Sequence, residues 1–255
     1  MPSVDRILTH GSPRREGVVP APLSAQLPLR LQDNPRARLM SVGKGGDVLV
    51  GGSRYGCWYL NHDGWLVSYK ILHKGDRQIL DFILPGEIFG LQAWAFKSSL
   101  YSVAAVTKAL ITTIPFDVVD DVLNQSPQLS KALLWSAISE AARLAEHVID
   151  AGRRSAYERL SHLFLELFLR SKLAGLAKGM SFNTPLTQEL IGDALGLSTI
   201  HVNRTLRCLR EGKLIGIDGK RVTILDFDAL ALLCDFENSY LGESARAWNM
   251  PQTRP

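Results

Sequence analysis

Residues 187–213 read TQELIGDALGLSTIHVNRTLRCLREGK and constrain the fold more than any other stretch of the chain. The pattern predicts one helix, a tight turn at Gly196 and a second helix. In the second helix, Val202, Leu206 and Leu209 recur at three- and four-residue spacing, so they lie on one buried stripe. Ser198 comes just before this helix, where its hydroxyl can accept a hydrogen bond from a free backbone N–H. The stretch therefore predicts a helix-turn-helix.

The opposite face of the second predicted helix is polar and basic. Hydrogen-bond donors on a helix that enters the major groove suit phosphates and base edges. The overall net charge of +4 is mild and indicates no partner by itself. Residues 198–224, however, hold six basic residues against two acidic ones, which is the local excess typical of nucleic-acid binders. The side chains of this face are Thr199, His201, Asn203, Arg204, Arg207 and Arg210.

Length and cysteine content limit the other possibilities. The 255 residues are enough for two modest domains with full cores. Cys57, Cys208 and Cys234 are far apart, so no disulfide framework or metal signature can be derived from them. We find no secretory signal and no apolar run long enough for a membrane helix, and therefore expect a cytoplasmic protein without a membrane partner.

The N-terminal half is predicted to be a β domain that follows a flexible arm. Residues 1–28 contain several prolines and a GSPRREG stretch, which indicates the arm. Within residues 29–122, short apolar or alternating segments at 47–52, 64–72, 78–84 and 102–115 are separated by HKGD, LPGE and KSS turns. Short strands at this spacing favour a closed or sandwich-like β domain.

The hydrophobic period becomes helical from residue 117 to about residue 152. We predict a dimerisation helix over residues 123–152, because a long, narrow, alanine-rich stripe is typical of a helix that packs against another helix. The alternative is a long helix that covers its own β domain. The predicted seam consists of Leu133, Ala137, Ala141, Leu144 and Val148.

Residues 153–236 are predicted to form a winged helix-turn-helix domain, followed by a tail at 237–255. A further helix covers residues 153–173, and Thr187 is the expected N-cap of the first helix of the motif. Asp218 and Gly219 stand between β-branched runs, which is a strong hairpin signal. Lys220 and Arg221 at the tip of this wing would contact the phosphate backbone.

The order of these parts resembles the Crp/Fnr family of bacterial transcription regulators. The resemblance is most specific in LTQELIGDALGLSTIHVNRTLRCLREGKLI and in KGDRQILDFILPGEIFGL, residues 74–91. It implies an α+β fold with a cupin-like, cyclic-nucleotide-binding-type β-roll, a long dimerisation helix and a C-terminal winged helix-turn-helix. It also implies a homodimer that binds pseudo-palindromic double-stranded DNA operators and recruits or blocks RNA polymerase.

The resemblance also suggests where an effector would bind. Members that bind cyclic nucleotides carry Gly-Glu after the Pro-Gly turn and Arg-Ser about ten residues later. Here Leu91 follows Gly90, and Tyr101 stands before Ser102 in place of the arginine. A buried phosphate without its arginine loses a bidentate charge-assisted contact, so cyclic AMP is disfavoured as the effector. The candidate effector-pocket residues are Gly86, Glu87, Gly90, Trp94, Tyr101 and Ser102.

Other cofactors of the family are disfavoured as well. Iron–sulfur members need a group of N-terminal cysteines, and this chain has none before Cys57. Nothing in the spacing of His62, His73 and Cys57 indicates a haem site, and we interpret both histidines as solvated loop residues. His147 is interpreted as an interface or surface residue. We therefore predict no cofactor and no metal.

Within the recognition helix, the resemblance assigns Arg204 to a guanine of each half-site, a contact that discriminates by about 1–3 kcal/mol. Family members carry a glutamate four residues earlier, where this chain has Ile200, so the half-site should differ there. Asn203, Thr199 and His201 are further candidates for base contacts. The predicted contacts to the DNA backbone are Ser198, Arg207, Arg210, Lys220 and Arg221.

Three alternatives stay open. Cys208 is next to Arg207 and is either a redox-sensitive thiol or a small, semi-buried filler. The β-roll is either vestigial or a sensor for an unidentified ligand, with Trp94, Phe96 and Tyr101 as a possible apolar site. A protein-binding winged-helix scaffold is the alternative to a DNA reader, although the basic face argues against it. No metal motif, nucleophile elbow, P-loop or carboxylate pair indicates an enzyme.

Overall fold

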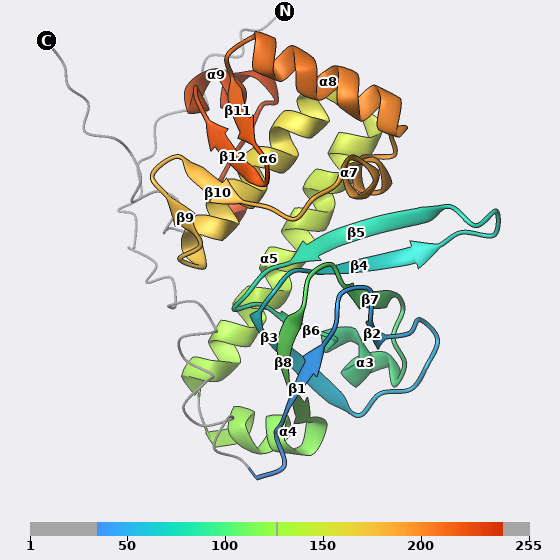
Figure 1. The fold of residues 1–255 in the computed structure, drawn as a ribbon. Helices are drawn as coiled ribbons and strands as arrows, with labels where there is room; N and C mark the ends of the chain where they lie inside the picture. Colours follow the sequence, from blue (N-terminus) through green and yellow to red (C-terminus); the bar gives the residue numbers. More distant parts are fainter. Residues whose placement is uncertain (1–34, 126, 242–255) are drawn as a thin grey trace, which may run out of the picture.

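The computed structural model describes residues 35–125 and 127–241 (Figure 1). The predicted N-terminal arm and residues 242–255 of the predicted tail lie outside the described residues. The chain forms a β domain, a long central helix and a C-terminal domain that contains a second, smaller sheet. No helix within the described ranges is both long and apolar enough to cross a membrane.

The N-terminal domain is a β-roll of two four-stranded antiparallel sheets, with strand orders β1-β8-β3-β6 and β2-β7-β4-β5. Its core is apolar, and Leu49, Leu66, Val103 and Ile111 are fully buried between the sheets. One short helix, α3 (Leu91–Phe96), separates β6 from β7. The strands are β1 (Arg38–Val42), β2 (Asp47–Leu49), β3 (Cys57–Asp63), β4 (Leu66–Ile71), β5 (Arg77–Ile83), β6 (Ile88–Phe89), β7 (Ser102–Ala105) and β8 (Ala109–Pro115).

The four predicted strand segments all contain strands, and the segment 102–115 contains two, β7 and β8. The sequence interpretation missed β3. Its residues Trp58, Tyr59, Leu60 and Asn61 are buried in succession, so the strand has no alternation of apolar and polar positions. His62 is also on β3, where its Nε2 lies 2.7 Å from Thr112 Oγ1, so its interpretation as a solvated loop residue is wrong.

The helical region after the β-roll consists of two helices. Helix α4 (Phe116–Gln125) covers the end of the β-roll, and α5 (Pro127–Gly152) is the long helix. The dimerisation helix, predicted over residues 123–152, begins at Pro127 in the structure. Proline fits the first turn of a helix, because no backbone N–H is needed there. In Figure 1, α5 runs from the β-roll to the C-terminal domain.

One residue of the predicted seam is misassigned. Leu133 is buried and packs against Trp58, Ile114 and Val118 of its own β-roll and α4, so it is not available to a second chain. Leu144 is half-buried, whereas Val148 is 71% exposed. Ala137 and Ala141 are exposed. The exposed apolar face of α5 consists of Leu134, Ala137, Ile138, Ala141, Ala145 and Val148.

The C-terminal domain is a winged helix-turn-helix. Helix α6 (Ala156–Leu173) is buried on every side from Leu160 to Ser171, because the wing sheet, the other helices and the β-roll all pack around it. The sheet has the strand order β11-β12-β10-β9. The remaining elements are β9 (Ala177–Lys178), β10 (Ser181–Asn183), α7 (Gln188–Leu195), α8 (Thr199–Glu211), β11 (Ile215–Asp218), β12 (Arg221–Ile224), α9 (Phe227–Leu233) and a 3-10 helix at Ser239–Leu241.

Candidate DNA-binding surface

Local sequence signals set the positions of α7 and α8, which form the predicted helix-turn-helix. Thr187 Oγ1 accepts a hydrogen bond from Leu190 N–H at 3.2 Å and caps α7. Gly196 ends α7 with φ 65°, a left-handed conformation that favours glycine. Ser198 Oγ accepts from His201 N–H at 3.3 Å and caps α8. These contacts confirm the predicted caps and the predicted turn.

A second glycine lets the turn pack closely on α7. A Cβ at Gly192 would lie 2.5 Å from the carbonyl oxygen of Leu197, which is too close for any side chain. On α8, Val202 and Leu209 are fully buried and Leu206 is half-buried, as the periodicity predicts. One face of α8 is therefore fixed against the domain core, and the other is exposed.

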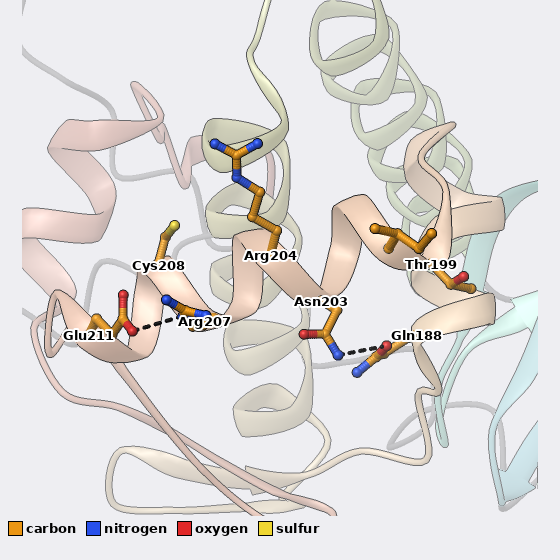
Figure 2. Close-up of a pocket in the computed structure, with 8 residues that line it drawn as sticks. Gln188, Thr199, Asn203, Arg204, Arg207, Cys208 and Glu211 are labelled. Carbon is orange, nitrogen blue, oxygen red and sulfur yellow. Dashed lines mark hydrogen bonds and ion pairs between the residues drawn. The ribbon is translucent and has the colours of Figure 1, made fainter.

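The exposed side of α8 borders a surface depression, shown in Figure 2. Asn203 Nδ2 donates a hydrogen bond to Gln188 Oε1 at 3.3 Å, which links the two helices of the motif across this surface. Arg207 Nε lies 2.9 Å from Glu211 Oε1. The lining residues are Gln188, Thr199, Ile200, Asn203, Arg204, Arg207, Cys208 and Glu211.

Three of the four predicted base readers, Thr199, Asn203 and Arg204, line this depression. His201 is exposed on α8 but does not line it. The sequence interpretation missed Gln188. Its signal was its place directly after the cap of α7, but only the folded motif places it opposite Asn203.

Most basic groups of this surface are electrostatically unpaired. Arg207 forms an ion pair with Glu211, whereas Arg204 forms neither a hydrogen bond nor an ion pair with any other side chain in the described part of the chain. Within that part, the side chains of Arg210, Lys220 and Arg221 also have no ion pair. An excess of exposed, unpaired positive charge around one helix is what an anionic backbone would neutralise.

The predicted wing is present. Strands β11 and β12 pair antiparallel from Ile215 with Ile224 to Asp218 with Arg221, and Gly219 supplies φ 55° at the turn. The backbone carbonyl of Lys220 accepts a hydrogen bond from Thr184 N–H at 2.8 Å, which ties the hairpin tip to the segment before α7. The tip is therefore held beside the helix-turn-helix with the side chains of Lys220 and Arg221 exposed.

Cys208 is exposed in the same depression as Arg204 and Arg207. Its interpretation as a semi-buried filler therefore does not match its place in the fold. Its redox sensitivity stays a prediction.

Comparisons with known proteins agree with this architecture. Residues 40–126 match the family model of the cyclic nucleotide-binding domain, and residues 158–233 match the family model of the Crp-like helix-turn-helix domain. The chain belongs to the Crp/Fnr family of transcription regulators. Its Crp-like helix-turn-helix is the DNA-binding domain, and its β-roll corresponds to the effector-binding domain of the family.

Individual relatives match over most of the chain. The Anaerobic regulatory protein of Haemophilus influenzae is 28% identical over 198 residues, which cover 78% of this chain and 77% of that protein. The Fumarate and nitrate reduction regulatory protein of Salmonella typhimurium is 27% identical over 201 residues, covering 79% and 80%. The structure of FixK2 from Bradyrhizobium japonicum superimposes with a TM-score of 0.70 at 26% identity and covers 77% of this chain and 96% of FixK2. These Crp/Fnr relatives are transcription regulators and not enzymes.

In the predicted effector loop of this Crp/Fnr member, a buried tyrosine stands where the family resemblance places an arginine. Tyr101, which replaces the phosphate-binding arginine, is only 8% exposed, and its hydroxyl lies 3.5 Å from Glu140 Oε1 of α5. Burial, together with nearby Asp81, raises the pKa of Glu140 above its usual range. The hydroxyl of Tyr101 is therefore accompanied by the carboxyl group of Glu140, with Arg143 of the same helix nearby.

The other candidate pocket residues differ in exposure and in their contacts. Trp94 is 51% exposed and Phe96 is 61% exposed, whereas Tyr101 is buried, so the described part of the chain does not bury the three aromatic side chains together. Ser102 Oγ accepts a hydrogen bond from Gly51 N–H at 3.0 Å. Gly86 and Gly90 both have positive φ and shape the turns on either side of β6.

Glu87, the remaining pocket candidate, instead binds the DNA-binding domain. Its Oε1 lies 3.0 Å from Arg170 Nε, and its Oε2 lies 2.8 Å from Arg170 Nη2. Arg170, on α6, also contacts Asp81 and Glu166 at 2.8 Å each and donates to the carbonyl of Phe82. A single buried guanidinium thus joins the β-roll to the helix-turn-helix domain.

The same charge cluster includes α5. Arg143 Nη2 lies 3.0 Å from Asp81 Oδ2, and His147 contacts Glu166 Oε2 and the carbonyl of Leu80 at 3.0 Å each. Burial opposes the charged imidazole, but the adjacent Glu166 outweighs it and raises the pKa of His147 to about 9. His147 is therefore an intramolecular partner of α6 and β5, and its interpretation as an interface or surface residue is wrong.

Asp81, His147 and Glu166 lie close enough to form a metal site. Both carboxylates are already bound by Arg143 or Arg170, so the guanidinium groups supply the positive charge that a metal ion would bring. The cluster thus fits a structural ion-pair network better than a metal centre.

Proposed function

We propose that this Crp/Fnr regulator acts as a homodimer that binds a pseudo-palindromic DNA operator sequence-specifically. The observation that carries the proposal is the exposed basic face of α8, where Arg204 has no ion-pair partner among the described residues, together with the exposed wing residues Lys220 and Arg221. A recognition helix of this kind reads base edges with its N-terminal residues, while surrounding cations contact phosphates. Because its operators would lie on the chromosome, we expect the regulator to act in the bacterial cytoplasm, with RNA polymerase as its partner.

The dimer is supported by the exposed face of α5. Leu134, Ile138, Ala141, Ala145 and Val148 follow one another at steps of four, three, four and three residues. This average spacing of 3.5 residues is that of a coiled-coil seam between two helices. Regulators of this family act as dimers, and two half-sites one helical turn apart require two recognition helices related by a two-fold axis.

The signal that controls this regulator is not a cyclic nucleotide in our proposal. Support comes from the Tyr101–Glu140 contact, which occupies the place where a phosphate would need its arginine. The β-roll either takes another effector or acts as a fixed support, with no iron–sulfur cluster, haem or other cofactor. The scaffold alternative, in which the winged helix binds protein, lacks an explanation for the unpaired cations.

Binding to a random-sequence duplex over a range of salt concentrations separates DNA binding from scaffolding. We expect the full chain to bind at low salt and the logarithm of Kd to rise linearly with the logarithm of salt concentration, because bound counterions are released. A variant with Arg204, Arg207 and Arg210 replaced by alanine should lose most of this binding. The control Arg54→Ala, exposed on the β-roll, should keep it. No binding at low salt would support the scaffold.

A further inference from the structure

Ile200 is the second residue of α8, and its side chain is 82% exposed. It packs in none of the hydrophobic clusters formed by the described residues. A single exposed apolar side chain is ordinary on a protein surface. The position of Ile200 is what distinguishes it, because it lines the depression that also contains Thr199, Asn203 and Arg204.

The side chain of Ile200 can neither donate nor accept a hydrogen bond. Among the groups by which base pairs are distinguished in the major groove, the C5-methyl of thymine is the only alkyl group; the others are hydrogen-bond donors or acceptors. Facing a polar base edge, Ile200 would remove water from that edge without replacing its hydrogen bonds, which is unfavourable. Facing a thymine methyl, it would bury apolar surface on both sides.

The spacing along α8 sets the distance between this contact and that of Arg204. The two residues are four positions apart and so lie on the same face of the helix, with Cβ atoms about 5–6 Å apart. Successive base pairs rise by about 3.4 Å. Ile200 and Arg204 should therefore reach base pairs that are one or two steps apart.

We infer that Ile200 is a specificity-determining residue that contacts the C5-methyl of a thymine in each half-site, within two base pairs of the guanine read by Arg204. The inference rests on the proposed DNA-binding function and adds the chemistry of one base position to it. The operator of this protein accordingly carries a T·A pair there, and the discrimination depends on a methyl group instead of a hydrogen bond.

Replacing thymine by uracil removes only the C5-methyl and tests the contact directly. An operator selected from random DNA is synthesised with 2′-deoxyuridine in place of each thymidine, one symmetric pair of positions at a time, and Kd is measured by fluorescence anisotropy. For the wild-type protein we expect one position at which Kd rises about fourfold per half-site, the loss for one buried methyl group. Ile200→Ala should bind the thymine and uracil operators equally well.

Two further variants make the result specific. Ile200→Val keeps a branched side chain and should retain part of the discrimination. Leu232→Ala removes an apolar side chain that is 86% exposed on α9 of the same domain, and it should keep the full uracil effect. All three substitutions alter exposed side chains, so the domain should stay folded.

The outcomes separate this inference from the proposed function. If the wild-type protein prefers the selected operator over a scrambled one but no uracil substitution weakens binding, the inference is wrong and the proposed function stands. An unchanged uracil effect in Ile200→Ala also overturns it, because another side chain then contacts the methyl. If the selected and scrambled duplexes bind equally, the proposed function itself fails, and the inference fails with it.

Discussion

Residues of the α8 surface differ in whether their charge is already neutralised within the chain. Arg207 contacts Glu211 at 2.9 Å, an exposed pair on one helix face that contributes at most about 0.5 kcal/mol to stability. Arg204 has no such partner among the described residues and keeps its guanidinium free for a base. Bidentate recognition of guanine O6 and N7 requires that free planar group.

Arg204→Ala should therefore flatten the sequence preference at one base pair in each half-site, by about 10- to 100-fold. Lys220→Ala should instead weaken binding to all sequences alike and lower the salt slope by about one. Both are measured as Kd on the selected operator and on its single-base variants. Equal losses for Arg204→Ala on every sequence would show that it contacts only the backbone.

The residues of this surface could largely be predicted from the sequence, because cap residues, the turn glycine and the apolar period of α8 are all local signals. Gln188 could not, since its role depends on the distance to Asn203 in the folded motif. The candidate effector residues illustrate a second limit. Motif positions indicated a pocket, whereas in the structure Trp94 is exposed and Glu87 binds Arg170. Both the exposure and the contact depend on how distant segments pack.

Among the elements, α5 has one buried and one exposed apolar face. Leu133 is buried against the β-roll, while adjacent Leu134 is 62% exposed. The sequence predicted a helical seam, but two neighbouring leucines do not reveal which one faces the chain's own β-roll. The phase of the seam is therefore set by how α4 and α5 dock on the β-roll.

Ile138→Glu should convert the dimer to monomers, because it places two charges at the centre of the seam. Analytical ultracentrifugation of the purified protein measures the change. The control is Leu133→Ala, which should lower the free energy of unfolding by about 2–5 kcal/mol and leave the dimer intact. A dimer that survives Ile138→Glu would show that subunits associate through another surface.

The whole molecule is connected by the charge cluster around Arg170. Its members come from β5, the loop before β6, α5 and α6. The cluster therefore joins the β-roll, the long helix and the C-terminal domain. A separate ion pair, in which Arg77 Nε lies 2.7 Å from Asp193 Oδ2, joins α7 to β5. Single members of such buried networks are costly to remove, about 3–5 kcal/mol, because their partners stay charged and buried. No sequence pattern predicted the cluster, since its residues are distant in the chain.

The cluster predicts a specific pH dependence. The pKa of His147 is about 9 in the folded chain and about 6.5 when unfolded, so the charged imidazole stabilises the fold fully below pH 6.5. This contribution is lost as the pH rises through about 9. The stability difference between wild type and His147→Gln, from urea denaturation, should therefore shrink by up to about 3 kcal/mol between pH 6 and pH 10. Parallel pH profiles would contradict the assignment.

We expect two copies of this chain to read one symmetric DNA site. Selection of bound sequences from a random DNA pool, with the purified full chain, tests it most directly. We expect an inverted repeat whose half-site centres are about 10 base pairs apart, the spacing of two recognition helices on one face of the duplex. A pool without any enriched sequence, or one enriched only in a single unsymmetrical site, would contradict the claim.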